Sequence, residues 1–178
     1  MQGIAMRKIA FAAALIAAAG LAGTAAHAQT AIPPSPKDFL AAASQSDEYE
    51  IQAGHTAQAQ SRDPRVRAFA EQMIRDHTQT REALGQAAAA SGMAPPWPAM
   101  SADQARMLGS LQSLRGTDFD QAYARQQALA HAQAVAVEGS FASAGADPNL
   151  RRAAQAGLPT IQGHLEMARQ LSRQTGAS

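Results

Sequence analysis

Apolar residues recur at helical spacing along four long stretches of this chain. In residues 64–90 the inward positions include Val66, Phe69 and Met73, and a histidine, His77, takes the next inward position. An α-helix turns about 100° per residue, so His77 lies about 40° from Met73 on the same face. The pattern predicts an amphipathic helix that directs a polar side chain into the core.

Three further long helices are expected over residues 35–61, 117–145 and 147–175, and each also carries polar residues on its inward face. The inward stripes are Phe39, Ala43, Asp47, Glu50, Gly54 and Ala57 in the first, Tyr123, Gln127, Ala130, Ala134, Val137 and Phe141 in the third, and Leu150, Ala154, Leu158, Ile161, His164, Leu165 and Ala168 in the fourth. His131 and Glu138 share one edge of the third face, because seven residues make about two turns.

Local signals mark where these helices begin. Ser35-Pro36, Asp63-Pro64 and Asp147-Pro148 each combine a capping side chain with a proline suited to the first helical position. Thr117-x-x-Asp120 resembles a capping box for the third long helix. Pro159 predicts a kink, or a break and restart, within the fourth.

The connection between the second and third long helices contains a short helix of its own. Residues 93–100 hold three prolines around Trp97 and predict a surface crossover that Trp97 pins onto the bundle. Ser101 then restarts a helix with Leu108 and Leu111 at its apolar positions. The fold predicted is all-α: a ferritin-like up-down four-helix bundle with an extra short helix before the third long helix.

The first residues read as an export signal. Arg7 and Lys8 form a basic region, an apolar run follows over residues 9–21, and Ala26-His27-Ala28 is a small-x-small cleavage site. The expected organisation is a cleaved signal peptide over 1–28, a linker over 29–36 and the bundle over 37–175. An uncleaved anchor is the alternative, although the run is short for a membrane span. The expected location is the periplasm.

Composition narrows the classes of partner and chemistry. The chain has no cysteine, which excludes disulfides and thiolate metal ligands. Of 15 Lys and Arg residues two lie in the signal, so 13 remain against 14 Asp and Glu. A nearly neutral mature chain gives no reason to expect nucleic acid, and no membrane span is expected after cleavage. A homo-oligomer and unidentified protein partners stay open.

Polar residues that fall on inward faces are the candidate functional residues. They are Glu50, His77, His131, Glu138 and His164, with Asp76 and Met73 as supporting residues beside His77. Imidazole and carboxylate together suit iron, manganese, zinc or copper, and bundles build such sites between facing helices. His55 lies about 140° from Glu50 and is expected on the surface.

A buried His–Glu network without metal is the competing interpretation, because such groups can also satisfy one another and fix the register of a bundle. No glutamate is followed by histidine at the third position, although di-iron bundles use Glu-x-x-His on two helices. This absence argues against an ordinary ferroxidase centre and leaves enzymatic activity undecided.

An ordered series of motifs resembles a known bacterial family, the domain of unknown function 4142. The motifs are Phe39-Leu, Tyr49-Glu50-Ile51, Phe69-Ala-x-x-Met73-x-x-Asp76-His77-Thr78, Phe119-Asp120-x-x-Tyr123, Ala-His131 and Leu158-Pro159-x-x-x-x-His164-Leu. The resemblance covers about residues 37–171 and implies an exported, ferritin-like bundle whose recurrent polar positions are Glu50, Asp76, His77, His131 and His164. It implies no activity, because the family has none established.

Two functions from different classes therefore compete at this point. The leading hypothesis is an exported bundle that binds a transition metal for storage, buffering or stress response. The alternative is a metal-free structural or stress-response protein of the cell envelope that acts through protein partners.

Overall fold

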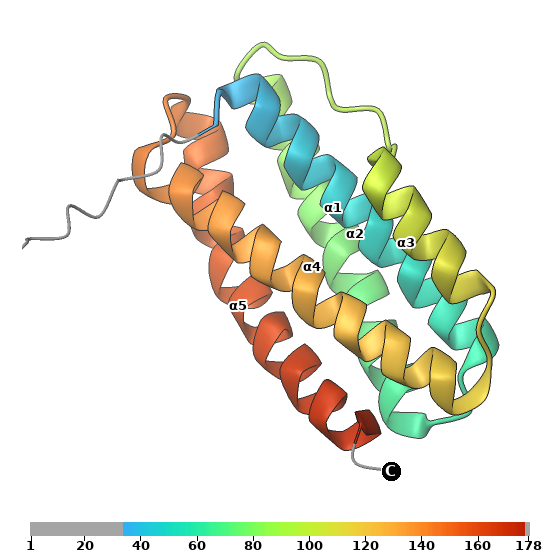
Figure 1. Ribbon diagram of the computed structural model, residues 1–178. Coiled ribbons are helices and arrows are strands. Elements are labelled where there is room, and N and C mark those ends of the chain that lie inside the picture. Colours follow the sequence, from blue (N-terminus) through green and yellow to red (C-terminus); the bar gives the residue numbers. More distant parts are fainter. Residues whose placement is uncertain (1–33, 177–178) are drawn as a thin grey trace, which may run out of the picture. The chain divides into compact units, whose positions relative to one another are not determined.

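The computed structural model describes residues 34–176, and within this range every regular element is an α-helix. The helices are α1 (Pro36–Gln60), α2 (Pro64–Ala90), α3 (Ala102–Gln112), α4 (Gly116–Ala144) and α5 (Pro148–Gly176) (Figure 1). The all-α prediction, with a short helix before the third long one, is confirmed. The predicted signal peptide, residues 1–28, lies outside the described residues.

Side-chain caps fix three of the long helices where the sequence signals predict them. The Ser35 hydroxyl accepts from the backbone N–H of Asp38 at the start of α1. Asp63 accepts from the N–H of Arg65 at the start of α2, and Asp147 accepts from two backbone N–H groups at the start of α5. Each cap satisfies N–H groups that have no partner inside the helix.

The start of α4 differs from the prediction. The helix begins at Gly116 after Arg115, whose side chain makes no capping hydrogen bond, and Thr117 already lies inside it. Asp120 instead accepts a hydrogen bond from the Ser61 hydroxyl at 2.5 Å. This contact joins segments far apart in the sequence, so the local pattern gave no sign of it.

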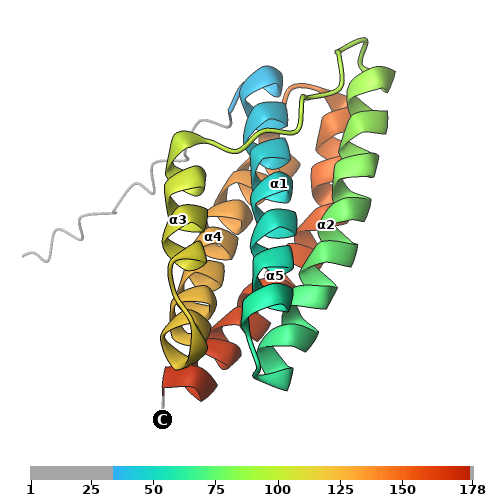
Figure 2. The same cartoon turned by 90° about the vertical axis from the view of Figure 1, so that its right-hand side faces the viewer.

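The long helices pair as two hairpins that face each other. α1 packs most extensively against α2, and α4 against α5, while α2–α5 and α1–α4 contacts join the hairpins. Along the chain the five helices alternate in direction, so the two long helices α2 and α4 run the same way (Figure 1). The loop after α2 and helix α3 make this return, and α3 packs on α1 and α4 (Figure 2).

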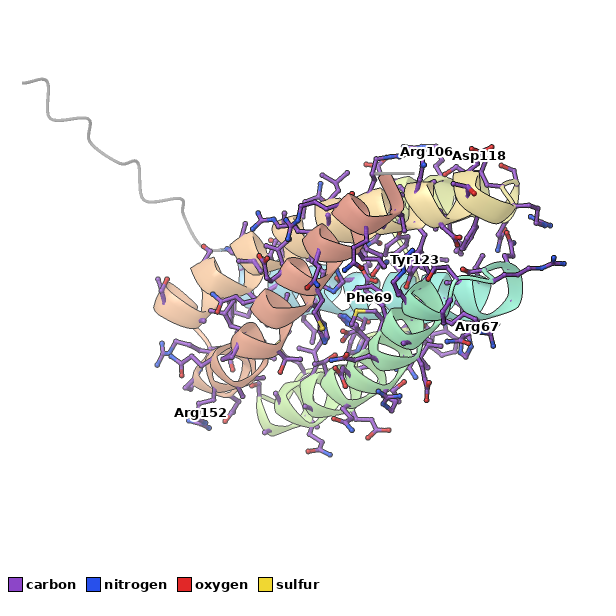
Figure 3. The ribbon with its side chains drawn as sticks, turned by 90° about the horizontal axis from the view of Figure 1, so that it is seen from below. Arg67, Phe69, Arg106, Asp118, Tyr123 and Arg152 are labelled. Carbon is purple, nitrogen blue, oxygen red and sulfur yellow. The ribbon has the colours of Figure 1, made fainter. Side chains whose placement is uncertain are left out.

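The buried apolar residues form two clusters, one toward each end of the bundle. The first joins Tyr49, Phe69, Met73 and Tyr123 with neighbouring side chains, and Figure 3 shows Phe69 and Tyr123 directed inward while Arg67, Arg106 and Arg152 point outward. The second is built around Phe39 and Phe141, whose rings stack with their centroids 4.0 Å apart. Between the two clusters lie most of the buried polar side chains: Asp47, Glu50, His77, Gln127, His131 and His164.

Trp97 and Pro159 differ from what the sequence predicts, whereas His55 lies where it is expected. Trp97 is 85% exposed, so the prediction that it pins the crossover onto the bundle is wrong. Helix α5 continues through Pro159, so no break and restart occurs there. His55 is exposed on α1, as predicted. No described helix is both long and apolar enough for a membrane span.

Candidate metal centre

Three histidine rings from three helices meet in the polar middle of the bundle. His77 of α2, His131 of α4 and His164 of α5 are each at most 2% exposed. One nitrogen of each ring lies within 4.8 Å of the others. The shortest separation is 3.4 Å, between Nε2 of His77 and Nε2 of His131. Imidazoles so close together are what a shared metal ion requires.

Each ring is held from outside the cluster by an oxygen acceptor. Nδ1 of His77 lies 2.8 Å from Oδ1 of Asp47, a carboxylate of α1 that also accepts from the Thr80 hydroxyl at 2.7 Å. Nδ1 of His131 donates to the backbone carbonyl of Gln127 at 2.9 Å, since a carbonyl can only accept. These bonds place the proton of each neutral ring on Nδ1 and leave Nε2 as the nitrogen with a lone pair.

His164 has the same arrangement with its two nitrogens exchanged. Its Nε2 lies 2.8 Å from Oδ2 of Asp76, which comes from the facing helix α2. Its Nδ1 is buried and has no hydrogen-bond partner among residues 34–176. Outer hydrogen bonds to a carboxylate or a backbone carbonyl are the usual support for metal-binding histidines. All three rings therefore have an outer oxygen partner, and the second nitrogen of His164 has no partner in the described residues, while those of His77 and His131 contact each other.

Burial controls the charge of the rings. Burial lowers the pKa of His131 to about 3, and the neighbouring His77 lowers it further. Burial likewise lowers the pKa of His164 to about 4, against the opposing hydrogen bond with Asp76. Both rings are therefore neutral near pH 7, which is the state that binds metals.

His77 behaves differently from the other two rings. Burial disfavours its charged form, but the hydrogen bond with Asp47 and the carboxylates of Glu50 and Asp47 outweigh this effect and raise its pKa. In the metal-free protein His77 can therefore be the one ring that is protonated at both nitrogens, and its Nε2–H then donates to Nε2 of His131. A divalent ion would take the place of that proton.

Glu50 lies next to the rings, with unsatisfied polar atoms around it. Its carboxylate is 1% exposed, and Oε1 lies 3.8 Å from Nδ1 of His131. Burial raises the pKa of Glu50 to about 7, while the charge of His77 opposes the rise. Both Glu50 oxygens, the Gln127 amide and the Tyr123 hydroxyl find no hydrogen-bond partner in the described part of the chain. An unpaired buried polar group costs about 1–3 kcal/mol, so this side of the centre is suited to a further polar occupant.

Glu138 and Met73, also selected from the sequence, are not grouped with the three rings. Glu138 is half-buried and lines two cavities beside the centre, and burial raises its pKa to about 8. It lies seven residues from His131 on α4, about 10 Å along the helix axis. Met73 is fully buried and packs in the apolar cluster with Tyr49 and Phe69. Asp76, proposed as a supporting residue, contacts His164 rather than its neighbour His77.

Sequence reasoning missed the roles of Asp47 and Gln127. Both fall on inward stripes, but neither was identified as the partner of a histidine: Asp47 accepts from His77, and the Gln127 backbone carbonyl accepts from His131. The available signal for Asp47 was a carboxylate at a core position, which requires a buried partner. For Gln127 it was the spacing of four residues before His131, which places its carbonyl within reach of that ring.

Comparison with known proteins identifies the fold and the family. A crystal structure of a DUF305 fragment from Deinococcus radiodurans is similar with a TM-score of 0.65 and 20% sequence identity, over 79% of this chain and 99% of that one. At this identity the likeness shows the fold alone. No protein of curated function matches the chain. The family model "Domain of unknown function (DUF4142)" matches residues 21–171, most of the chain, and the protein therefore belongs to the domain of unknown function 4142 family.

Proposed function

We propose that the polar centre binds one divalent transition-metal ion through His77, His131 and His164. The observation that carries the proposal is that an outer oxygen acceptor holds one nitrogen of each ring, while the other nitrogens of His77 and His131 lie 3.4 Å apart and that of His164 has no hydrogen-bond partner among residues 34–176. The binding atoms are Nε2 of His77, Nε2 of His131 and Nδ1 of His164. Glu50 is a carboxyl neighbour of this set, 3.8 Å from the outer nitrogen Nδ1 of His131, and like Glu138 it is not grouped with the three rings.

The spacing of the rings supports this proposal. Nitrogen ligands about 2.0–2.1 Å from a tetrahedral ion are about 3.3 Å from one another. The His77–His131 nitrogen separation of 3.4 Å already has this value. The 4.8 Å limit on the remaining pairs requires adjustments of about 1.5 Å at most, which side-chain rotations supply.

The charges around the centre support a cation. Asp47 and Asp76 bring two carboxylates to the outer nitrogens, and Glu50 adds a third group beside His131. Two of the three imidazoles are neutral, so they compensate none of this charge. A divalent ion would balance the outer carboxylates at short range in an interior where charge interactions are weakly screened.

Imidazole-rich sites with carboxylate neighbours suit iron, manganese, zinc or copper. Such an ion would supply Lewis acidity, and redox chemistry in the case of iron, manganese or copper. The role proposed for the protein is storage or buffering of metal, or a stress response, in the periplasm after export. Export is tested by cell fractionation with N-terminal sequencing, which is expected to recover a periplasmic chain that begins at Gln29.

Metal analysis of the full chain purified from its native compartment tests the binding proposal. We expect about one equivalent of a transition metal in the wild-type protein and loss of that metal in His131→Ala. The matched control is His55→Ala, which removes an exposed histidine of α1 and leaves the content unchanged. Sub-stoichiometric metal in the wild-type protein under every supply condition would overturn the proposal.

A metal-free envelope protein acting through partners is the second candidate. The observation that favours it is the continuous contact from Asp47 through His77 to His131, with separations of 2.8 and 3.4 Å, which a protonated His77 satisfies without any ion. On this account His131→Ala changes stability alone and leaves the cellular phenotype intact. A specific loss of function in a well-folded His131→Ala variant contradicts it.

A further inference from the structure

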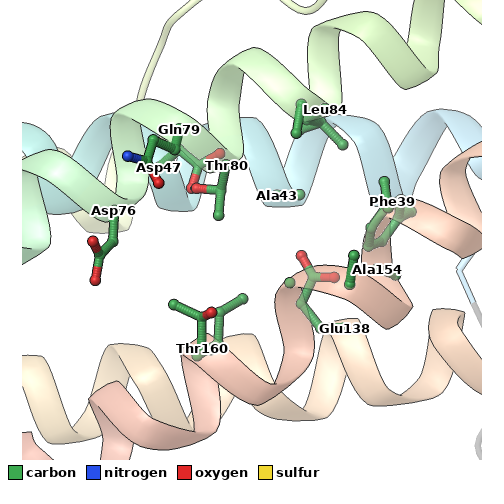
Figure 4. A pocket seen from close by; sticks show the side chains of 15 residues that line it. Phe39, Ala43, Asp47, Asp76, Gln79, Thr80, Leu84, Glu138, Ala154 and Thr160 are labelled. Atoms are coloured by element: carbon green, nitrogen blue, oxygen red, sulfur yellow. The ribbon is translucent and has the colours of Figure 1, made fainter.

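A cavity of about 350 Å³ lies beside the metal centre, between α2 and α5 (Figure 4). Its wall includes Asp47 and Asp76, the two carboxylates that hold His77 and His164 from outside. Glu138 of α4 is a third carboxyl group on the wall, and Figure 4 shows Asp76 and Glu138 reaching into the space from different sides. The rest of the lining is mainly small or apolar, with two threonines and a glutamine. The acidic groups therefore face a space with little competing positive charge.

A second cavity, of about 170 Å³, lies toward α3 and has His77 itself on its wall. The two cavities share four lining residues: Ala43, Asp47, Glu138 and Ile161. Asp47 and Glu138 therefore stand where the two spaces adjoin, one of them in direct contact with His77. An ion at this junction would lie beside the Asp47 carboxylate, which contacts Nδ1 of His77.

We infer that the larger cavity is the entry route by which a divalent cation reaches the three histidines, and that Glu138 binds the ion on its way. This inference rests on the metal-binding function proposed above and assigns a role to a residue that lies outside the ring cluster. The carboxylates of Asp47 and Asp76 in this partly enclosed apolar space attract cations and repel anions, because low-dielectric walls focus the field. Glu138 adds a third carboxyl group, which releases its proton to solvent when it binds the ion. Glu138 lies about two helical turns from His131, so it can contact the ion before it reaches the rings but not once it is bound there.

Gly157 offers a way to close the route without touching a charged residue. It lies on the cavity wall in α5, and a Cβ built there meets nothing within 4 Å. Gly157→Leu therefore fills the cavity with an apolar side chain, and leucine is a better helix former than glycine. Gly109→Leu is the matched control, because Gly109 is an exposed helical glycine of α3 with the same free space around it.

The association rate of Co²⁺ is measured by stopped-flow absorbance after Co²⁺ is mixed with the metal-free full chain, and the dissociation rate after the loaded chain is mixed with a chelator. We expect association with Gly157→Leu to be at least tenfold slower than with the wild type, and Gly109→Leu to match the wild type. For Glu138→Gln we expect association and dissociation to slow together by about threefold or more, with equilibrium affinity unchanged within twofold. The control for the loss of a carboxyl group is Glu82→Gln, at an exposed position of α2.

The outcomes separate this inference from the function on which it rests. If the wild-type chain binds Co²⁺ but Gly157→Leu and Glu138→Gln associate as fast as their controls, the route is wrong and the metal centre stands. If Glu138→Gln weakens equilibrium binding through faster dissociation alone, Glu138 is a ligand and the inference is overturned. If the wild-type chain binds no Co²⁺, the metal function and the entry route fall together.

Discussion

The apolar ends of the bundle and its polar middle are built from the same helices but contribute to stability in opposite ways. At one end Phe39 and Phe141 stack with their ring centroids 4.0 Å apart and are completely buried. In the middle, His77, His131 and His164 are also almost completely buried, but Nδ1 of His164 and the carboxylate and amide atoms of Glu50 and Gln127 have no hydrogen-bond partner among residues 34–176. The ends gain stability from burial, whereas the middle costs stability unless something binds there.

The metal-binding proposal explains why the middle of the bundle is polar although apolar residues could fill it. Replacing buried polar groups with well-packed apolar residues is often neutral or stabilising. The two apolar clusters on either side show that these helices can supply such packing. Variants at the apolar ends should therefore lower the free energy of unfolding without changing metal binding. Variants in the polar middle should weaken metal binding and leave the stability of the metal-free protein unchanged or higher.

The largest expected effect is at the apolar end. Phe141→Ala removes a fully buried ring and its stacking partner contact, and we expect a loss of about 3–5 kcal/mol in the free energy of unfolding. Urea denaturation measures this loss. Leu129→Ala, at a position of α4 that is 53% exposed, is the control and should change stability by less than about 0.5 kcal/mol. Metal bound per folded Phe141→Ala molecule should equal the wild-type value.

In the polar middle the stabilisation should come from the ion. Metal at about 100 times its dissociation constant is expected to raise the unfolding free energy of the wild type by about 2.7 kcal/mol. His131→Leu should lose this increment and, in chelator, should be at least as stable as the metal-free wild type. Urea denaturation with and without metal measures both. A His131→Leu variant that still gains stability from metal would place the ion elsewhere.

The outer carboxylates should have a smaller effect than the rings they hold. Asp76→Asn keeps an acceptor for Nε2 of His164 but removes the charge, and we expect metal affinity to fall about 10–100-fold. Competition with a chelator of known affinity measures the change. Asp103→Asn, at an exposed position of α3, should leave affinity unaltered. Equal affinities in both variants would exclude a supporting role for Asp76.

The smallest expected effect concerns Glu138 in the metal-free protein. Burial raises its pKa to about 8 in the folded chain, so the folded state keeps a proton that the unfolded state releases near pH 4.5. Its contribution to stability is present below about pH 4.5 and is lost as pH rises through about 8. Between pH 5 and pH 9 the wild type should therefore lose on the order of 1 kcal/mol relative to Glu138→Gln, given partial exposure. The midpoints of urea denaturation in the presence of chelator, measured at both pH values with Glu82→Gln as control, test whether stability falls as predicted when the pH rises.

The sequence predicted the helices well because their signals are local. Asp63-Pro64 and Asp147-Pro148 begin α2 and α5 as expected, and helical periodicity placed His77, His131 and His164 on buried faces. Periodicity gives the angle of a residue around its helix but not its level along the bundle. Glu138 shares the face of His131 yet lies about two turns away, and only tertiary packing reveals that separation.

Contacts between segments far apart in the chain could not be predicted, because they also depend on tertiary packing. The start of α4 was misplaced because Asp120 accepts from Ser61 of another segment instead of capping its own helix. Asp76 was expected to support a neighbouring ring, but its partner His164 is 88 residues away on α5. Trp97 was expected to pin the crossover onto the bundle, but its side chain is exposed, and whether a loop residue packs depends on contacts that no local pattern shows.

Whether the three rings bind one metal ion is tested by an anomalous difference map from crystals of the metal-loaded chain, recorded on both sides of the absorption edge of the metal. We expect one strong peak between the three rings, about 2.0–2.3 Å from Nε2 of His77, Nε2 of His131 and Nδ1 of His164. The absence of a peak between the rings, or peaks at surface carboxylates alone, would contradict it.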